Sequence, residues 1–180
     1  MATILSKSTA RWCATASAPV LAAVISVLVT PTAAYAAGPY QLKNYRTLKC
    51  AGVSGASLAN YAKVVQRTCN NDSDSQFWWF IKPPNHPGVE WIWIQNVNSL
   101  ACMQAPYSDN ADDAVYQYDC NVSTVRQRWY RVSMGNGVYL IKNYHTKRCL
   151  YVMQGSLLDG ALIGTVACGT SYAHYRWYIN

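Results

Sequence analysis

The residue types that most often carry out catalysis are scarce in this sequence. Its three histidines, His86, His145 and His174, lack the spacing of metal ligands, both with one another and with acidic residues. Hydrolysis of a glycosidic bond usually needs two carboxylic acids flanking the bond, and Glu90 is the only glutamate. The sequence therefore predicts a protein without catalytic activity, cofactor or metal ion.

The composition narrows the fold class. The 180 residues are 51% hydrophobic and 13% charged, which excludes a disordered chain. There are 14 tyrosines and 7 tryptophans but only 2 phenylalanines, and aromatic rings with a polar atom suit strands, half-exposed surfaces and ligand pockets. A helical bundle would need far more glutamate. The net charge of +7 favours acidic partners without naming one.

Residues 1–36 have the pattern of a secretory signal peptide. Lys7 and Arg11 form a basic start, an apolar run covers residues 19–29, and Ala34-Tyr35-Ala36 offers small residues where signal peptidase reads the chain. The alternative is a membrane anchor, but the apolar run is too short to span a bilayer. We expect a secreted protein with no membrane span. The alanine-rich leader is typical of bacteria such as actinomycetes.

The remaining residues, 37–180, contain 13 basic residues, 8 acidic residues and six cysteines. An even number of cysteines in a small exported domain indicates a disulfide framework, which leaves no free thiol nucleophile. The cysteines form three successive pairs with spacings of 19, 18 and 19 residues. Equivalent repeats should bond alike, which predicts the disulfides Cys50–Cys69, Cys102–Cys120 and Cys149–Cys168. Each contributes about 3 kcal/mol in the chain-entropy model.

Two further landmarks recur in register with the cysteines. A tryptophan follows nine residues after each second cysteine, and an asparagine precedes each first cysteine by six residues. The tryptophans are Trp78, Trp129 and Trp177, and the asparagines are Asn44, Asn96 and Asn143. Such self-similarity predicts three repeated units, at about 40–82, 89–132 and 137–180.

Short apolar runs within each unit, such as residues 91–94 and 138–141, predict β-strands separated by turns. The stretch Pro83–Gly88 cannot hold a central strand and predicts an exposed loop. The tripeptide Gly135-Asn136-Gly137 predicts a tight hairpin. Three such units favour a closed all-β body, because closure removes exposed sheet edges.

Two units end in a Gln-x-Trp triplet, Gln76-Phe77-Trp78 and Gln127-Arg128-Trp129, and the third ends in Tyr175-Arg176-Trp177. With three repeats and paired cysteines in each, residues 40–180 resemble the ricin-type (R-type, QxW) β-trefoil lectin family. The resemblance implies an all-β β-trefoil, in which twelve strands form a six-stranded barrel with a hairpin cap.

The repeated glutamines and tryptophans are explained without any ligand. One large indole from each repeat would fill the core near the pseudo-threefold axis, and the glutamine side chains would bond local backbone. The residues with this structural role are Gln76, Trp78, Gln127, Trp129 and Trp177.

Sugar binding in this family uses other positions. A binding repeat usually has an acidic residue two positions after its first cysteine, an aromatic residue two before its second, and Asn just before the triplet. The carboxylate accepts hydrogen bonds from vicinal hydroxyls, the ring stacks on the C–H face of the sugar, and the amide completes the network. At these positions the first repeat has Gly52, Arg67 and Ser75, the second has Gln104, Tyr118 and Arg126, and the third has Tyr151, Val166 and His174.

No repeat keeps the acid or the Asn, and the second repeat is the best candidate for a carbohydrate pocket. Tyr118 would stack on a sugar, and Gln104 would replace the acid beside Gln127. Arg126 would contact hydroxyls or an anionic substituent.

The loop next to this pocket and the third repeat offer weaker candidates. Asp112 and Asp113 would supply the missing carboxylate, and the alternative for them is a solvated turn. Tyr151, His174 and Tyr175 would form an aromatic site, and the alternative is a degenerate, closed pocket. The first repeat is expected not to bind sugar.

These observations predict a secreted, non-catalytic lectin for cell-surface or cell-wall glycans. Arginine at two pocket positions favours acidic glycans. The protein would act alone or as the targeting subunit of a secreted, toxin-type assembly with protein partners. The alternative is a β-trefoil that has lost sugar binding and serves as a protein-interaction or inhibitor module, with the 83–88 loop as its contact. Nucleic-acid binding is not expected, because the basic residues are scattered.

Overall fold

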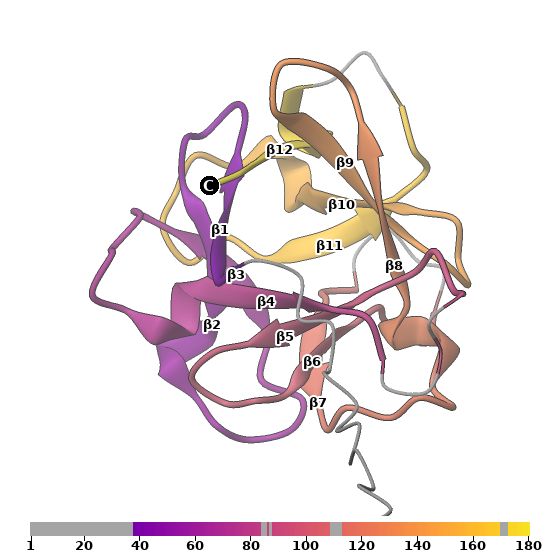
Figure 1. Cartoon of the computed structure of the whole chain (residues 1–180). Helices are drawn as coiled ribbons and strands as arrows, with labels where there is room; N and C mark the ends of the chain where they lie inside the picture. The colour runs from indigo at the N-terminus through magenta and orange to yellow at the C-terminus, as the bar shows by residue number, and fades with distance from the viewer. Residues whose placement is uncertain (1–37, 84–85, 87, 109–112, 170–172) are drawn as a thin grey trace, which may run out of the picture. The chain divides into compact units, whose positions relative to one another are not determined.

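The computed structural model describes residues 38–83, 86, 88–108, 113–169 and 173–180, so the expected signal peptide, residues 1–36, lies outside the described residues. The described residues form twelve β-strands (Figure 1). The strands are β1 (Tyr40–Asn44), β2 (Cys50–Val53), β3 (Val64–Arg67), β4 (Phe77–Ile81), β5 (Trp93–Asn96), β6 (Cys102–Gln104), β7 (Tyr116–Tyr118), β8 (Trp129–Ser133), β9 (Val138–Asn143), β10 (Cys149–Val152), β11 (Ile163–Val166) and β12 (Arg176–Ile179).

Helical structure in the described residues is limited to five single turns of 3-10 helix. These turns are η1 (Ser54–Ala56), η2 (Asp74–Gln76), η3 (Val125–Gln127), η4 (Met153–Gly155) and η5 (Ala173–Tyr175). Within the same residues, no helix has the length and apolar character needed to cross a membrane.

Six strands form a ring of antiparallel pairs, which is the barrel of a β-trefoil. β12 pairs with β1, β1 with β4 and β4 with β5, while β8 pairs with β9 and β9 with β12. The ring is completed between β5 and β8 by one bridge, in which the backbone N–H groups of Ile92 and Trp129 donate to each other's carbonyl at 2.9 and 3.0 Å. The predicted all-β trefoil fold is confirmed.

The other six strands form three hairpins, β2–β3, β6–β7 and β10–β11, which make the cap. Single bridges join the hairpins to one another, for example Lys63 to Tyr116. Glutamine side chains add to these contacts: the Gln117 Nε2 donates to the carbonyls of Ser57 and Ala59, both at 2.9 Å. In the same way, the Gln66 Nε2 donates to the carbonyls of Ser156 and Leu158, at 2.8 and 3.0 Å. Each cap loop of the first and third repeats is therefore held by a neighbouring repeat.

The three tryptophans of the repeated triplets lie in the barrel core. Trp78, Trp129 and Trp177 are fully buried and belong to one apolar cluster with residues such as Leu42 and Ile94. Each indole N–H donates to the carbonyl of the residue that follows the first cysteine of its repeat, at 2.9 to 3.0 Å. The burial of three indoles with satisfied donors explains their spacing without a ligand.

The repeated asparagines join neighbouring repeats. The Asn143 Nδ2 donates to the carbonyls of Arg126 and Arg128, at 2.9 and 3.2 Å, and its Oδ1 accepts from two backbone N–H groups of the following turn. Asn44 and Asn96 make the same set of bonds at their own junctions. These buried amides fix the 3-10 turns that carry the triplets.

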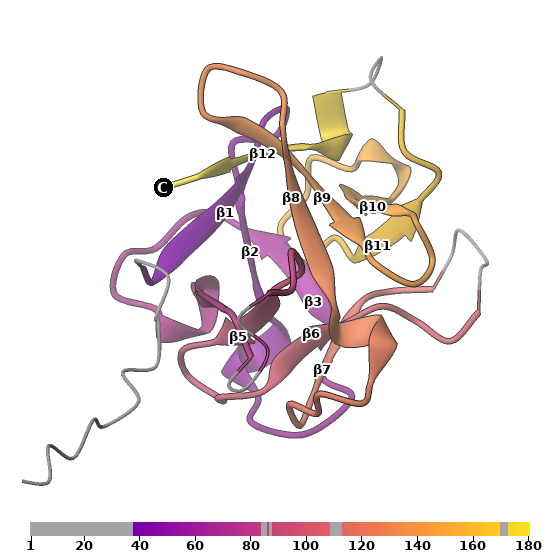
Figure 2. The same cartoon turned by 45° about the vertical axis from the view of Figure 1, so that its right-hand side comes forward.

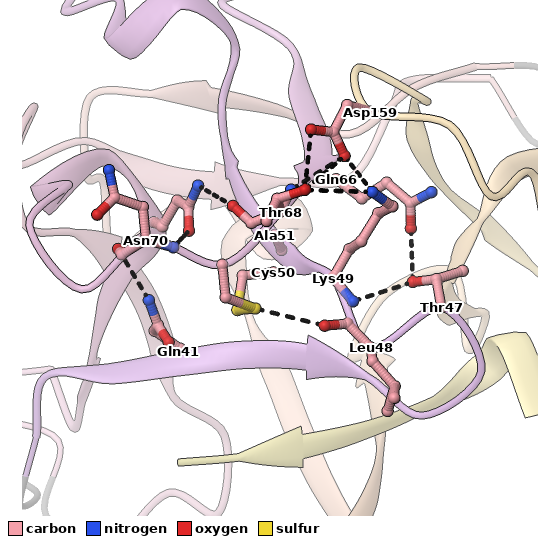
Figure 3. The surroundings of a disulfide bond; sticks show 12 residues. Gln41, Thr47, Leu48, Lys49, Cys50, Ala51, Gln66, Thr68, Asn70 and Asp159 are labelled. Atoms are coloured by element: carbon pink, nitrogen blue, oxygen red, sulfur yellow. Dashed lines mark hydrogen bonds and ion pairs between the residues drawn. A yellow bond between two sulfur atoms is a disulfide. The ribbon is translucent and has the colours of Figure 1, made fainter.

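The structure confirms the three predicted disulfides, Cys50–Cys69, Cys102–Cys120 and Cys149–Cys168. Beside the first disulfide, the Asp159 carboxylate of the third repeat forms an ion pair with Lys49 (Figure 3). The same carboxylate accepts hydrogen bonds from the Thr68 N–H, at 3.0 Å, and from its hydroxyl, at 3.1 Å. Each disulfide lies within one repeat, whereas the Asp159 carboxylate joins the third repeat to the first.

The sequence predicted a tight hairpin at residues 135–137 and an exposed loop at residues 83–88. The structure describes the hairpin completely and the loop only in part. The hairpin between β8 and β9 turns through residues 134–137, and Gly135, Asn136 and Gly137 all have positive φ angles, of 86°, 51° and 72° (Figure 2). In the connection between β4 and β5, which contains the expected 83–88 loop, residues 84, 85 and 87 lie outside the described residues.

Candidate carbohydrate-binding site

The second repeat has a buried chain of polar side chains at its expected pocket. Gln127, in η3, donates through Nε2 to Gln104 Oε1 at 3.0 Å, and Gln104 Nε2 donates to the Tyr116 hydroxyl at 2.8 Å. Gln104 and Tyr116 are cross-strand partners in the β6–β7 hairpin. Gln104 has 1% of its surface exposed and both ends of its amide are engaged. It therefore holds Tyr116 in place rather than facing a ligand directly.

Burial raises the pKa of Tyr116 to about 12, while the hydrogen bond with Gln104 and the charge of Arg126 act in the opposite direction. The phenol is therefore protonated at physiological pH. Because its oxygen accepts from Gln104, its own O–H remains a donor.

Arg126 is fixed beside this chain at both its backbone and its side chain. Its carbonyl accepts from Asn143 and from the N–H of Ala105, at 2.9 and 3.1 Å. Its guanidinium donates to the Pro106 carbonyl and lies over the ring of Tyr107, 5.1 Å from the centroid. Tyr107 is exposed. A held cation with further donors is suited to sugar hydroxyls or an anionic group.

Tyr118 is half-buried and lies opposite Cys102, two cross-strand pairs away from Gln104 and Tyr116. Its ring meets Tyr61 of the first repeat edge to face, with centroids 5.0 Å apart, and Tyr61 also lies 5.4 Å from the Tyr116 ring. A hydrogen bond with Tyr118 raises the pKa of Tyr61. The result is an aromatic surface shared by two repeats.

Sequence reasoning missed Tyr116 and Tyr61. The strand register could have found Tyr116, because a hairpin from Cys102 to Cys120 places it opposite Gln104. No local signal marks Tyr61, since it reaches the site through contacts between two repeats.

The expected acidic residues next to the pocket are only partly described. Asp112 lies outside the described residues. Asp113 is half-buried, and its carboxylate accepts a hydrogen bond from the Ser108 hydroxyl. The structure therefore ties Asp113 to its own loop.

In the third repeat, aromatic side chains fill the position where a sugar would lie. Tyr151 and Tyr175 are 7% and 9% exposed, and their rings meet edge to face with centroids 6.0 Å apart. His174 packs against Tyr175 at 4.3 Å, and Met153 completes the buried cluster. Burial, together with the charge of Arg46, lowers the pKa of His174. The packing matches the closed-pocket alternative.

The first repeat leaves no space at the equivalent position. A Cβ atom on Gly52 would lie 2.9 Å from Gln76 Cγ and 3.1 Å from the Ser75 carbonyl. The Gln76 amide is bonded to the backbone of Thr68 and Asn70. The Gln-x-Trp glutamine thus occupies the site itself.

The second repeat combines buried amides, a phenol, a fixed guanidinium and partly exposed aromatic rings. Such groups can hydrogen-bond hydroxyls and pack against the C–H face of a sugar. Among the described residues, no cluster of three or more His, Cys, Asp or Glu side chains could hold a metal ion.

Comparison with known proteins assigns the family. Residues 78–166, which include the whole second repeat, match the family model described as ricin-type β-trefoil lectin domain-like. A search of curated proteins found no match. The chain contains a ricin-type β-trefoil lectin-like domain, and this family supports a carbohydrate-binding role.

Solved structures share the fold. The designed threefold-symmetric protein ThreeFoil is 23% identical with a TM-score of 0.70, over 79% of this chain and 98% of its own. An exo-β-1,3-galactanase from Clostridium thermocellum is 26% identical with a TM-score of 0.70, over 80% of this chain but only 30% of its own. The C-half of an earthworm R-type lectin in complex with GalNAc is 14% identical with a TM-score of 0.60, over 78% of this chain and 96% of its own.

Proposed function

We propose that this protein is a secreted, non-catalytic lectin whose binding site is the second repeat. The observation that supports this most is the contrast between the three equivalent positions. Gln76 fills the first position and aromatic side chains fill the third. The second instead holds the buried, hydrogen-bonded pair Gln104 and Tyr116, close enough to Arg126 for its charge to act on the Tyr116 phenol.

Recognition would proceed through groups that the buried amides orient. The Tyr116 O–H donates to a sugar hydroxyl, Tyr118 stacks on the C–H face, and Arg126 contacts a hydroxyl pair or a carboxylate or sulfate. The family's carboxylate is missing at Gln104, whereas a positive charge stands at Arg126. This replacement favours an acidic glycan of a cell surface or wall.

Export and assembly belong to the same proposal. Three disulfides suit an oxidising compartment, and residues 1–36 would direct export. In the galactanase this fold covers about a third of a larger chain. The domain here would act alone or as the targeting subunit of a secreted assembly.

A glycan array with the oxidised protein, at low and at moderate salt, tests the proposal. We expect binding to a defined glycan that survives moderate salt, because contacts in a pocket are screened less than surface charge. Tyr118→Ala and Arg126→Gln should each weaken it about tenfold or more. Arg67→Gln is the matched control, since it removes an exposed arginine at a pocket position of the first repeat.

Equal losses from Arg67→Gln and Arg126→Gln would show that net charge, not a pocket, binds the glycan. A blank array from folded protein would reject the lectin proposal.

The two closed pockets favour a second candidate, a protein-binding module that uses the connection between β4 and β5. Deleting residues 84–87 should then abolish capture of a partner. On the lectin proposal the same deletion leaves glycan binding unchanged.

A further inference from the structure

An open hollow lies on the barrel away from the second-repeat pocket. It is lined by residues of the β8–β9 hairpin, of β12 and of the turn after β1, and has a volume of about 260 Å³. Figure 2 shows where the β8–β9 hairpin and β12 lie. Residues 134–136 and Val138 line one side, and Tyr45, Arg176 and Tyr178 line the other. Typical sites for drug-sized ligands measure roughly 300–1,000 Å³, so this hollow suits one small unit.

One side of the hollow is an aromatic and cationic surface. Arg176 and Tyr178 alternate with the buried Trp177 on β12, so both point out of the barrel. The Tyr45 and Tyr178 rings are 5.3 Å apart and tilted by 32°, and the Arg176 guanidinium lies 5.7 Å from the Tyr45 centroid. Tyr45 is 38% exposed. Arg176 is the single charged residue among those that line the hollow.

The same arrangement recurs at another junction of the barrel, where the chain itself covers it. Arg128 lies 5.7 Å from the ring of Tyr144, and Tyr144 lies 5.6 Å from Tyr130. There, Trp91 from the β4–β5 connection covers the guanidinium at 4.7 Å, and Lys147 stands over Tyr144 at 4.5 Å. The Arg128 cluster is therefore closed by its own neighbours.

The equivalent connection at the other junction, between β8 and β9, is only the tip at residues 134–137. These residues include no aromatic side chain, and Met134, Gly135 and Asn136 line the hollow together with Arg176. The tip is held by hydrogen bonds between Met134 and Val138 and between Val138 and Gly135, at 2.8 and 3.0 Å. Backbone hydrogen bonds therefore hold the part of the rim that the hairpin tip provides.

We propose that this hollow is a second ligand site, which binds one saccharide unit bearing a carboxylate or sulfate group. The tyrosine rings would take the C–H face of the sugar, Arg176 would pair with the anionic group, and the Asn136 amide would meet a hydroxyl. The choice of a sugar rests on the proposed function above, but the site is separate from the second-repeat pocket.

Calorimetric titration of the oxidised protein tests this, with trigalacturonate, sialyllactose and a sulfated heparin disaccharide as probes and lactose as the neutral comparator. At least one anionic probe should bind in about 0.15 M salt, and lactose should not compete with it. Arg176→Gln should weaken binding about tenfold or more. Met134→Trp should do the same by filling the hollow from an exposed position on the hairpin tip.

Arg128→Gln is the matched control, because it removes the same charge from the covered cluster and should leave binding unchanged. Thermal melting of each variant shows whether it remains folded. The proposal is overturned if no anionic probe binds or if Arg128→Gln costs as much as Arg176→Gln. Loss in Arg126→Gln with retention in Arg176→Gln would also overturn it, while supporting the second-repeat lectin site.

Discussion

At the scale of single residues, one position in each repeat differs in what surrounds it. That position, two residues after the first cysteine, holds Gly52, Gln104 or Tyr151. Glycine lets Gln76 close the first site, and tyrosine fills the third. Glutamine instead donates a hydrogen bond to the hydroxyl of the buried Tyr116, at 2.8 Å.

The closed first site leads to a stability prediction. Gly52→Ala should lower the free energy of unfolding by about 1–3 kcal/mol, because the new Cβ would lie 2.9 Å from Gln76 Cγ and 3.1 Å from the Ser75 carbonyl. Urea denaturation measures this. Gly164→Ala is the control, since its closest contact, 3.0 Å, is with the flexible side chain of Met153. A larger loss in the control would contradict the explanation.

Only some residues of the candidate site could be identified from the sequence. The resemblance to the lectin family, applied through the cysteines and the Gln-x-Trp triplet, identified the positions Gln104, Tyr118 and Arg126. Tyr116 depends on hairpin register, and Tyr61 enters from another repeat. Local spacing carries no information on such a contact, because packing between repeats brings the rings together.

At the scale of elements, Asp159 joins the loop after β10 to the β2–β3 hairpin (Figure 3). The hydrogen bond from Lys49, followed by that from the Thr68 N–H, lowers the pKa of Asp159 below its ordinary value of 3.8. A carboxyl whose pKa is lowered by folding stabilises the native state above its unfolded pKa. That contribution disappears as the pH falls through the folded pKa.

We therefore expect Asp159→Asn to be slightly less stable than the wild type near neutral pH. The effect should be small, because the pair is exposed to solvent. The difference should vanish as the pH falls below 3.8 and the wild-type carboxyl becomes protonated. Thermal unfolding of both proteins across this pH range measures the difference, and a gap that persists at low pH would contradict the ion-pair explanation.

At the scale of the whole domain, disulfides and barrel have different roles. Each disulfide links two cysteines within one repeat, whereas the repeats are joined to one another by strand pairing, buried asparagines and cap glutamines. Net positive charge adds a long-range attraction for acidic ligands but does not select among them.

Reduction of the disulfides should remove most of the stability. Three loops of this size contribute together on the order of 9 kcal/mol in the chain-entropy model, and whole domains are stable by roughly 5–15 kcal/mol. We expect the reduced protein to unfold at much lower denaturant concentration than the oxidised protein, as followed by circular dichroism. An unchanged midpoint would show that the barrel alone carries the stability.

The sequence by itself determined the repeat, the disulfide pairing and the all-β class, because these follow from landmarks and short apolar runs that recur along the chain. The resemblance carried by the Gln-x-Trp triplets added the trefoil fold. The tertiary structure alone decided which equivalent positions are filled and which residues surround Gln104. It also decided that Arg176 lines a hollow, whereas Trp91 lies over the Arg128 guanidinium. The physical reason is that side-chain packing between strands and between repeats determines what space is left. Near-identical local motifs can therefore have different neighbours in the folded protein.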